Sequence, residues 1–118
     1  MDGYADDVDY INTHGTGTLL NDALEAVVIQ RCFHKSPLIN STKSLMGHTL
    51  GASGAIEAAI TALSLQRQTT HMCKNLTEPI ADLNFATEAK YRSMQIALSQ
   101  SLAFGGHNCL LAFRRWEK

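Results

Sequence analysis

Short runs of hydrophobic residues alternate with polar turns along the chain and predict strands and helices in turn. Residues 8–12 form a β-branched and aromatic run that leads into a glycine-containing turn, and they predict a strand. A largely apolar stretch that begins at Asn21 or Asp22, either of which would cap it, and ends near Phe33 predicts a helix. Residues 38–41 predict a second strand, so the chain begins in the order β, α, β.

The clearest predicted element is a second helix, which ends near Arg67 and Gln68. Its apolar residues recur at the i, i+3, i+4, i+7 spacing, and we expect them to form one buried stripe. These residues are Ala52, Ala55, Ile56, Ala59, Ile60 and Leu63. Residues 69–90 follow an irregular pattern, so we expect mostly loop there, with a short strand near residues 70–72.

Two further strands are predicted at residues 94–102 and 109–113, on either side of a glycine-rich turn that is typical of a hairpin. Strands that alternate with helices imply an α/β fold with a parallel sheet. The final hairpin adds an antiparallel strand at one side of that sheet.

Three polar turns are expected to meet at one edge of this sheet, because each follows the carboxyl end of a strand. In parallel sheets, ligands bind at this edge. His14 follows the first predicted strand, Lys43 and His48 follow the second, and Phe104 follows the third long one. The second turn opens a helix, whose free N–H groups favour an anion together with Lys43. Glu57, inside that helix, would neutralise Lys43 if it faces inward.

Each of these features also has a plain structural interpretation. His14 would be incidental to a glycine-rich turn between a strand and a helix. An exposed Lys43–Glu57 ion pair would contribute only about 0–1 kcal/mol. We interpret His71 as a surface histidine, and Cys109, inside an apolar strand, as a small buried thiol.

Composition narrows the classes of function. The 118 residues are 45% apolar and carry a formal charge of −1, which suits one domain with a core. The lack of a basic surplus argues against nucleic acid, and no apolar run reaches the roughly 20 residues that span a membrane. The N-terminus is acidic and unlike a signal peptide, and three cysteines without a CxxC pair fit a reducing, cytoplasmic setting.

Taken together, the turns resemble the C-terminal half of β-ketoacyl-acyl-carrier-protein synthases, from about Val8 to Phe113. The resemblance implies a thiolase-like fold, with a mixed, mostly parallel sheet, helices and a final antiparallel hairpin. Residues 1–118 would be a partial C-terminal domain of an acyltransferase that performs decarboxylating Claisen condensation in fatty-acid or polyketide biosynthesis. The matching motifs are NTHGTGT at residues 12–18, STKSLMGH at 41–48 with GASG at 51–54, and FGGHN at 104–108.

The resemblance implies a role for each matching residue. His14 and His48 would line the malonyl thioester and assist decarboxylation as hydrogen-bond donors to the developing enolate. Lys43 would organise this site electrostatically, with Glu57 as its partner. Asp22 matches an acidic residue of the family, although a role at the start of the helix explains it equally well.

Three further residues would handle the substrate. Thr16 and Thr18 would bind the pantetheine arm, and Phe104 would gate the nucleophile and contribute its backbone N–H to the oxyanion hole. Two positions depart from the family pattern. Ala103 stands where a flexible glycine is usual, which puts ordinary gating in doubt, and His107 replaces a usual threonine.

The resemblance also implies partners. No cofactor is expected, because substrates arrive on the phosphopantetheine arm of acyl carrier protein. The nucleophilic cysteine belongs to the N-terminal half of these enzymes, and no cysteine here occupies a corresponding motif. We therefore expect the chain to need an N-terminal ketosynthase half or complementary subunit, and to dimerise in the complete enzyme.

Two alternatives and one further expectation accompany this interpretation. The chain would otherwise be a non-catalytic, chain-length-factor-like or scaffold subunit that binds carrier protein and a ketosynthase partner, although the retained histidines and lysine speak against it. A two-histidine metal site lacks a third ligand, and Lys43 would repel a cation.

In the resemblance, a strand and helix upstream of Val8 are missing and that strand lies mid-sheet, so we expect the chain alone to expose apolar sheet surface.

Overall fold

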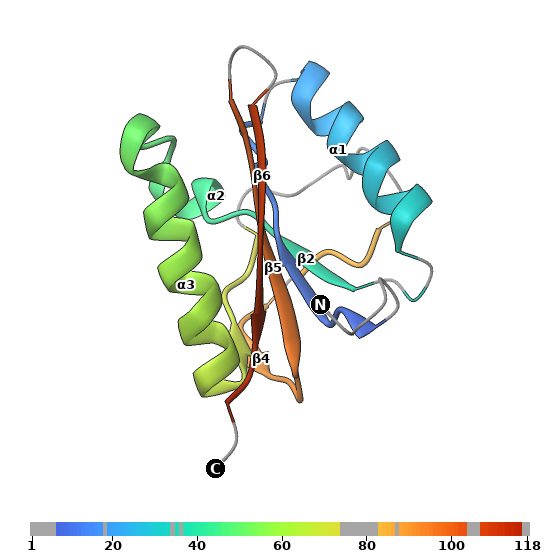
Figure 1. The fold of residues 1–118 in the computed structure, drawn as a ribbon, viewed down its shortest axis with the longest axis vertical. Helices are drawn as coiled ribbons and strands as arrows, with labels where there is room; N and C mark the ends of the chain where they lie inside the picture. The colour runs from blue at the N-terminus through green and yellow to red at the C-terminus, as the bar shows by residue number, and fades with distance from the viewer. Residues whose placement is uncertain are drawn as a thin grey trace.

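A computed structural model describes residues 7–17, 19–33, 35, 37–73, 83–86, 88–103 and 107–116 (Figure 1). Helices and strands alternate through the first part, and two long strands form the end. The elements are β1 (Tyr10–Asn12), α1 (Leu19–Cys32), β2 (Leu38–Asn40), α2 (Lys43–Met46), the 3₁₀ turn η2 (Leu50–Ala52), α3 (Ser53–Arg67), β3 (Thr69–Thr70), β4 (Lys90–Tyr91), β5 (Ile96–Ala103) and β6 (His107–Arg114).

The main sheet has four strands in the order β2-β1-β5-β6. β1 pairs in parallel with β2 and β5, so that Ile11 lies opposite Ile39 and Leu98. β5 and β6 pair in antiparallel fashion along their full length. The expected α/β fold with a mostly parallel sheet and a final hairpin is confirmed. β3 and β4 form a separate antiparallel pair, of which the second strand falls in the region expected to be loop.

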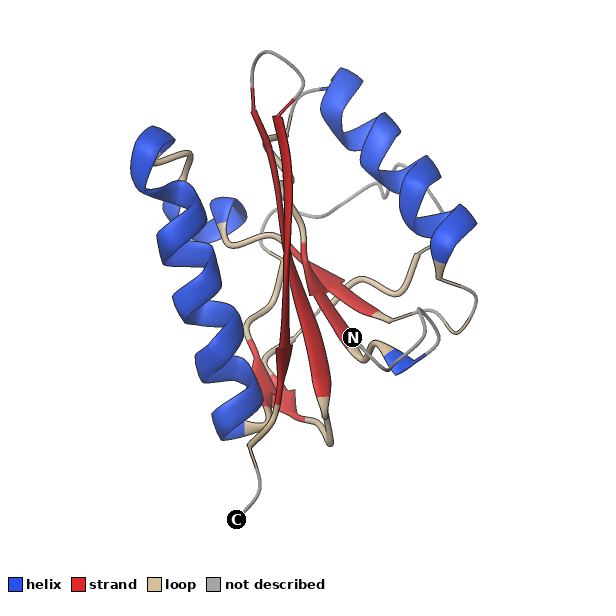
Figure 2. Cartoon of the chain, viewed as in Figure 1, coloured by secondary structure: helices blue, strands red, loops and turns tan. Residues whose placement is uncertain are grey.

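Helices cover both faces of the sheet, α1 on one and α3 on the other (Figures 1 and 2). Because successive strand residues point to opposite faces, the core divides in two. Ile29 of α1 packs in one cluster, which contains Val8, Ile11, Ile29, Ile39, Ile96 and Leu98. Leu65 of α3 packs in the other, which contains Tyr10, Leu38, Leu65, Ala86, Met94 and Ala97. Of the helices in the described ranges, none is long and apolar enough to cross a membrane.

The middle of the sheet differs from expectation. β1 pairs directly with β5, with Tyr10 opposite Ala97 and Asn12 opposite Ser99, so the described strands leave no gap. The pairing satisfies backbone groups that an open centre would leave buried without partners. The apolar sheet surface expected at this place is therefore not seen.

The predicted buried stripe of α3 is wrong in orientation. Ala55 and Ala59 are exposed, and Leu63 is 45% exposed. The residues that face the sheet are instead Ser53, Glu57, Thr61, Ser64 and Leu65. The buried hydroxyls are satisfied locally, since Thr61 donates to the Glu57 carbonyl at 2.7 Å and Ser64 to the Ile60 carbonyl at 2.8 Å. The hydrophobic period predicts the helix correctly, but its apolar face points away from the described sheet.

Candidate active site

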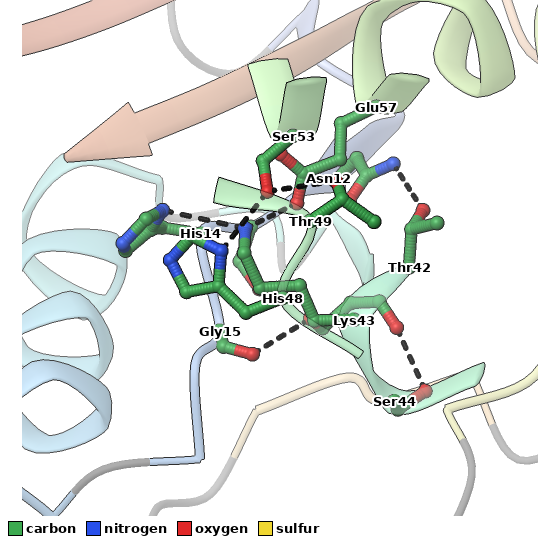
Figure 3. A network of polar contacts seen from close by, with 12 residues as sticks. Asn12, His14, Gly15, Thr42, Lys43, Ser44, His48, Thr49, Ser53 and Glu57 are labelled. Atoms are coloured by element: carbon green, nitrogen blue, oxygen red, sulfur yellow. Dashed lines mark hydrogen bonds and ion pairs between the residues drawn. The ribbon is translucent and has the colours of Figure 1, made fainter. Parts of the chain in front are cut away.

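The turns that follow β1 and β2 meet above the start of α3, as the sequence predicts (Figure 3). The rings of His14 and His48 lie edge to face, with centroids 5.8 Å apart. Lys43 Nζ lies 3.4 Å from His14 Nδ1 and 2.5 Å from Glu57 Oε1. Four of the predicted site residues, contributed by two turns and one helix, therefore form one cluster.

The Lys43–Glu57 pair is buried, with side chains only 4% and 2% exposed. The alternative of an exposed pair is therefore wrong. Removing one partner of a buried pair leaves an uncompensated charge, which typically costs about 3–5 kcal/mol. The pair thus holds a positive charge beside His14 and anchors the second turn on α3.

The hydrogen bonds of His48 settle which ring nitrogen carries the proton. Nδ1 accepts from the backbone N–H of Leu50 at 3.0 Å and lies 3.1 Å from the Ser53 hydroxyl. A nitrogen that accepts a backbone N–H cannot itself be protonated, so the proton of neutral His48 is on Nε2. His48 is exposed, which leaves this donor available to an oxygen of a ligand.

Neutral His14 has the same tautomer for a different reason. Its Nδ1 faces the Lys43 ammonium, which offers only donors, so the proton of neutral His14 is also on Nε2. Burial, followed by the positive charge of Lys43 and then that of His48, lowers the pKa of His14, while Asp22 opposes the shift. His14 is therefore neutral near pH 7 and presents a second N–H.

Two carboxylates in the first turns of α1 accept hydrogen bonds from the backbone of the His14 turn. Glu25 accepts the backbone N–H groups of His14 at 2.9 Å and Gly15 at 2.7 Å, one on each oxygen. Asp22 accepts the Gly17 N–H at 3.3 Å, so it contacts the turn of the site as well as beginning a helix. Glu25 was not predicted as a site residue, although its spacing of three from Asp22 places both on one helix face.

Close packing fixes the other side of this turn. Gly15 has a φ of +38°, and a Cβ atom there would lie 2.5 Å from Ser41 Oγ. The Ser41 hydroxyl donates to the Gly15 carbonyl at 2.9 Å and joins the two turns directly. Only glycine fits this position, because any side chain would collide with the second turn.

The remaining predicted residues fall in other places. Thr16 lines a cavity of about 410 Å³ between the two turns and α1, together with Glu25 and Lys43. Thr18 and Phe104 lie outside the described residues, so their roles stay predictions.

Two side-chain interpretations are wrong. His71 is half-buried and hydrogen-bonded to Thr42, whereas we expected a surface histidine. Cys109 is exposed rather than buried, because β6 is an edge strand with little cover in the described chain. The signal for His71 is tertiary, since its partner lies 29 residues away.

The described part of the chain contains no group of three or more His, Cys, Asp or Glu side chains able to hold a metal ion. The arrangement supplies instead two imidazole Nε2–H donors and one ammonium. Such a set stabilises negative charge that develops on an oxygen atom.

Comparison with solved structures places this fold among the ketosynthases. The chain superposes on a β-ketoacyl synthase from Burkholderia phymatum with a TM-score of 0.91 and 38% identity, covering 96% of this chain and 29% of that one. It also superposes on a ketosynthase solved with its chain length factor from Xenorhabdus doucetiae, with a TM-score of 0.83 and 36% identity, over 98% of this chain and 30% of that one.

Sequence comparison gives the family. A family model described as the C-terminal domain of β-ketoacyl synthase matches residues 2–77, and the chain belongs to this family. It is 38% identical to 3-oxoacyl-[acyl-carrier-protein] synthase 1 of Escherichia coli K12, over 98% of this chain and 29% of that protein. It is 37% identical to a polyketide-biosynthesis malonyl-ACP decarboxylase of Bacillus subtilis 168, over 96% of this chain and 28% of that protein. The chain thus spans under a third of the length of these relatives.

Proposed function

We propose that this chain is the C-terminal part, residues 1–118, of a 3-oxoacyl-[acyl-carrier-protein] synthase and supplies the donors for decarboxylation of a malonyl thioester. The observation that carries the proposal is the buried Lys43 beside two histidines whose Nε2 atoms bear protons. When a malonyl thioester loses CO₂, negative charge develops on the thioester oxygen. Preformed N–H donors stabilise that charge without reorganising in the transition state.

Each residue then has a defined role. His14 and His48 donate from Nε2 to the enolate oxygen, and Lys43, neutralised in part by Glu57, keeps His14 unprotonated. Thr16 lies in the cavity beside the His14 turn, which supports a contact with the pantetheine arm. We propose the same arm contact for Thr18 and the gating and oxyanion roles for Phe104, on the family motif alone. No cofactor takes part, because acyl carrier protein presents its substrates on phosphopantetheine.

The nucleophile comes from a second half-domain. None of Cys32, Cys73 and Cys109 occupies a motif of the nucleophilic cysteine. The outward apolar face of α3 supports an N-terminal ketosynthase half or complementary subunit as the partner, because such a face is normally covered. A dimer of the complete enzyme and a cytoplasmic location belong to the same proposal. A type II polyketide ketosynthase solved in complex with its acyl carrier protein is 30% identical to this chain and supports a carrier-protein partner.

The test assembles the enzyme from this chain and a polypeptide that carries the cysteine-bearing half. Malonyl-ACP decarboxylation and 3-oxoacyl-ACP formation are measured for the wild type and for His48→Ala. We expect the variant to lose about 100-fold or more in decarboxylation, the usual effect of removing one oxyanion donor. Equal activity of the two proteins contradicts the role of His48.

A second candidate function is malonyl-ACP decarboxylation without condensation. The similarity to the Bacillus subtilis decarboxylase favours it, as does the fact that the proposed donors all lie in this chain. CO₂ release without 3-oxoacyl-ACP in the assembled enzyme would select this function. Carrier-protein binding without either reaction would select the scaffold alternative.

A further inference from the structure

Thr42 immediately precedes α2, in the position of a capping residue, yet its side chain does not cap the helix. A threonine at this position usually bonds to a free backbone N–H of the first turn, which stabilises the helix. Here the hydroxyl is used by two other elements. Asn12, at the end of β1, lies 2.8 Å from Thr42 Oγ1, and His71, beyond β3, lies 3.0 Å from it.

The direction of each hydrogen bond follows from the atoms involved. The Asn12 amide Nδ2 donates to Thr42 Oγ1, so the Thr42 hydroxyl proton is free to point to His71 Nε2. His71 Nδ1 lies 2.7 Å from the Met72 carbonyl, which only accepts, so Nδ1 carries the imidazole proton. His71 is therefore the acceptor for Thr42, and neutral His71 satisfies both contacts.

The position of His71 is itself fixed from the sheet. Asn40 Nδ2 donates to the His71 carbonyl at 2.9 Å, and Asn40 Oδ1 accepts from the Tyr10 hydroxyl at 2.6 Å. Burial raises the pKa of Tyr10, which keeps it a donor. Thr42 is 2% exposed, and Asn12 and Tyr10 are fully buried, so the Asn12–Thr42 and Tyr10–Asn40 bonds are shielded from water, whereas the contacts of His71 are part-buried.

Thr42 fixes the backbone position of Lys43. The Thr42 carbonyl accepts the N–H groups of Leu45 at 3.0 Å and Met46 at 3.1 Å, and these bonds form the single turn of α2. Lys43 is the first residue of that turn. A shift of Thr42 would carry the Lys43 backbone with it, and the Lys43 side chain must reach both Glu57 and His14.

We propose that His71 is a positioning residue, which holds Thr42 and thereby places the Lys43 ammonium against His14 and Glu57. The expected effect on decarboxylation rests on the proposed function, whereas the placement of the Lys43 ammonium does not. His71 touches no reacting atom in this scheme. It acts through the Thr42 hydroxyl and the start of α2.

The test compares two variants that break the contact with two that keep it, all made in the assembled enzyme. Thr42→Val and His71→Phe remove the hydroxyl and its acceptor while retaining bulk. Thr42→Ser and His71→Gln keep a hydroxyl and an acceptor. We expect the breaking variants to lose about tenfold in kcat for decarboxylation with KM within about twofold, because small displacements of catalytic groups cost rate. The keeping variants recover most of the loss.

A double variant and a control show whether the two residues act as one unit. Thr42→Val/His71→Phe should be no slower than Thr42→Val alone, because Thr42→Val already removes the contact with His71 together with the bond from Asn12. Thr69→Val, at an exposed threonine outside the cluster, serves as the matched control and should leave kcat unchanged. The proposal is overturned if the loss of kcat in the double variant equals the product of the losses in the two single variants. It is also overturned if the breaking variants keep the wild-type kcat.

A spectroscopic measurement on the chain itself separates this proposal from the proposed function. In His71→Phe, NMR titration should give His14 a pKa closer to its ordinary value, because the Lys43 charge moves away from it. His71→Gln should restore the wild-type value. An unchanged His14 pKa in His71→Phe overturns the positioning role even if the wild type decarboxylates. The expected change supports it even if the wild type shows no activity.

Discussion

At the scale of single residues, the proton positions on the histidines define the chemistry. Leu50 N–H occupies His48 Nδ1 and the Lys43 ammonium faces His14 Nδ1, so both rings direct Nε2–H away from the protein framework. The sequence predicts which histidines take part, because both lie in polar turns after predicted strands and in motifs that resemble those of the family. It does not predict their tautomers, which depend on the backbone amide and the ammonium that the fold brings to each ring.

The charge of Lys43 should be measurable in the titration of His14. We expect Lys43→Met/Glu57→Gln to raise the pKa of His14 toward 6.5 without reaching it, because burial is the larger cause of the lowered value and remains. The double variant avoids leaving Glu57 charged and unpaired. NMR titration of labelled histidine measures the shift, and His14→Asn assigns the signal.

The same titration predicts a pH dependence of stability. The pKa of His14 is lower in the folded protein than in the unfolded chain, so the unfolded state binds the extra proton first on acidification. This contribution is complete above about pH 6.5 and is lost as the pH falls from there through the lowered folded value. The double variant should lose less stability over this window. An identical pH profile in both proteins would contradict the coupling to Lys43.

At the scale of elements, one side chain at the end of α3 joins the helix to Met94, two residues before β5. Gln68 Nε2 donates to the carbonyls of Leu65 at 2.7 Å and Met94 at 2.8 Å, and its Oε1 accepts the Met94 N–H at 2.7 Å. Gln68 is 3% exposed and adopts a left-handed φ of 54°. This residue therefore ends the helix and sets the level at which β5 starts.

Two substitutions separate these contributions of Gln68. Gln68→Ala loses the three bonds and should destabilise the chain by about 2–4 kcal/mol. Gln68→Gly loses the same bonds but accepts the left-handed backbone, so it should be about 1 kcal/mol more stable than the alanine variant. Urea denaturation followed by circular dichroism, at concentrations low enough to avoid self-association, gives both values. Equal stability of the two variants would show that the left-handed backbone costs nothing.

At the scale of the whole molecule, the apolar face of α3 is left without cover in the described chain. Leu63 is 45% exposed beside exposed Ala55 and Ala59, while the buried polar residues of the helix face the sheet and the site. The exposed apolar surface expected of the isolated chain therefore lies on this helix and on the edge strand β6, where Leu110 and Leu111 are exposed, rather than at the middle of the sheet. Small and branched side chains on one helix face suit close packing against another helix.

This face should mediate association. We expect Ala59→Glu to weaken binding of the cysteine-bearing half by about 100-fold or more, because it buries a charge without a partner. The same variant should reduce self-association of the isolated chain without unfolding it, since residue 59 is already exposed. Sedimentation velocity measures both effects. Gln30→Glu, at an exposed position of α1, is the control, and an equal effect of the two variants would remove the assignment to α3.

Local sequence patterns are sufficient to predict the order of elements, the mixed sheet and the turns that carry His14, Lys43 and His48. These follow from local patterns of hydrophobicity and from glycines in turns, which act over a few residues. Glu57 was also expected as the partner of Lys43, on the family resemblance and on the condition that it faces inward.

The side of each element that faces the site depends on long-range packing and could not be predicted from local patterns. The rotation of α3 depends on the strands it packs against, and the use of the Thr42 hydroxyl depends on Asn12 and His71, which lie 30 and 29 residues away. The hold of Glu25 on the His14 turn likewise requires α1 to pack back over the end of β1. A periodic pattern gives a helix an apolar face and a polar face, and long-range packing chooses between them.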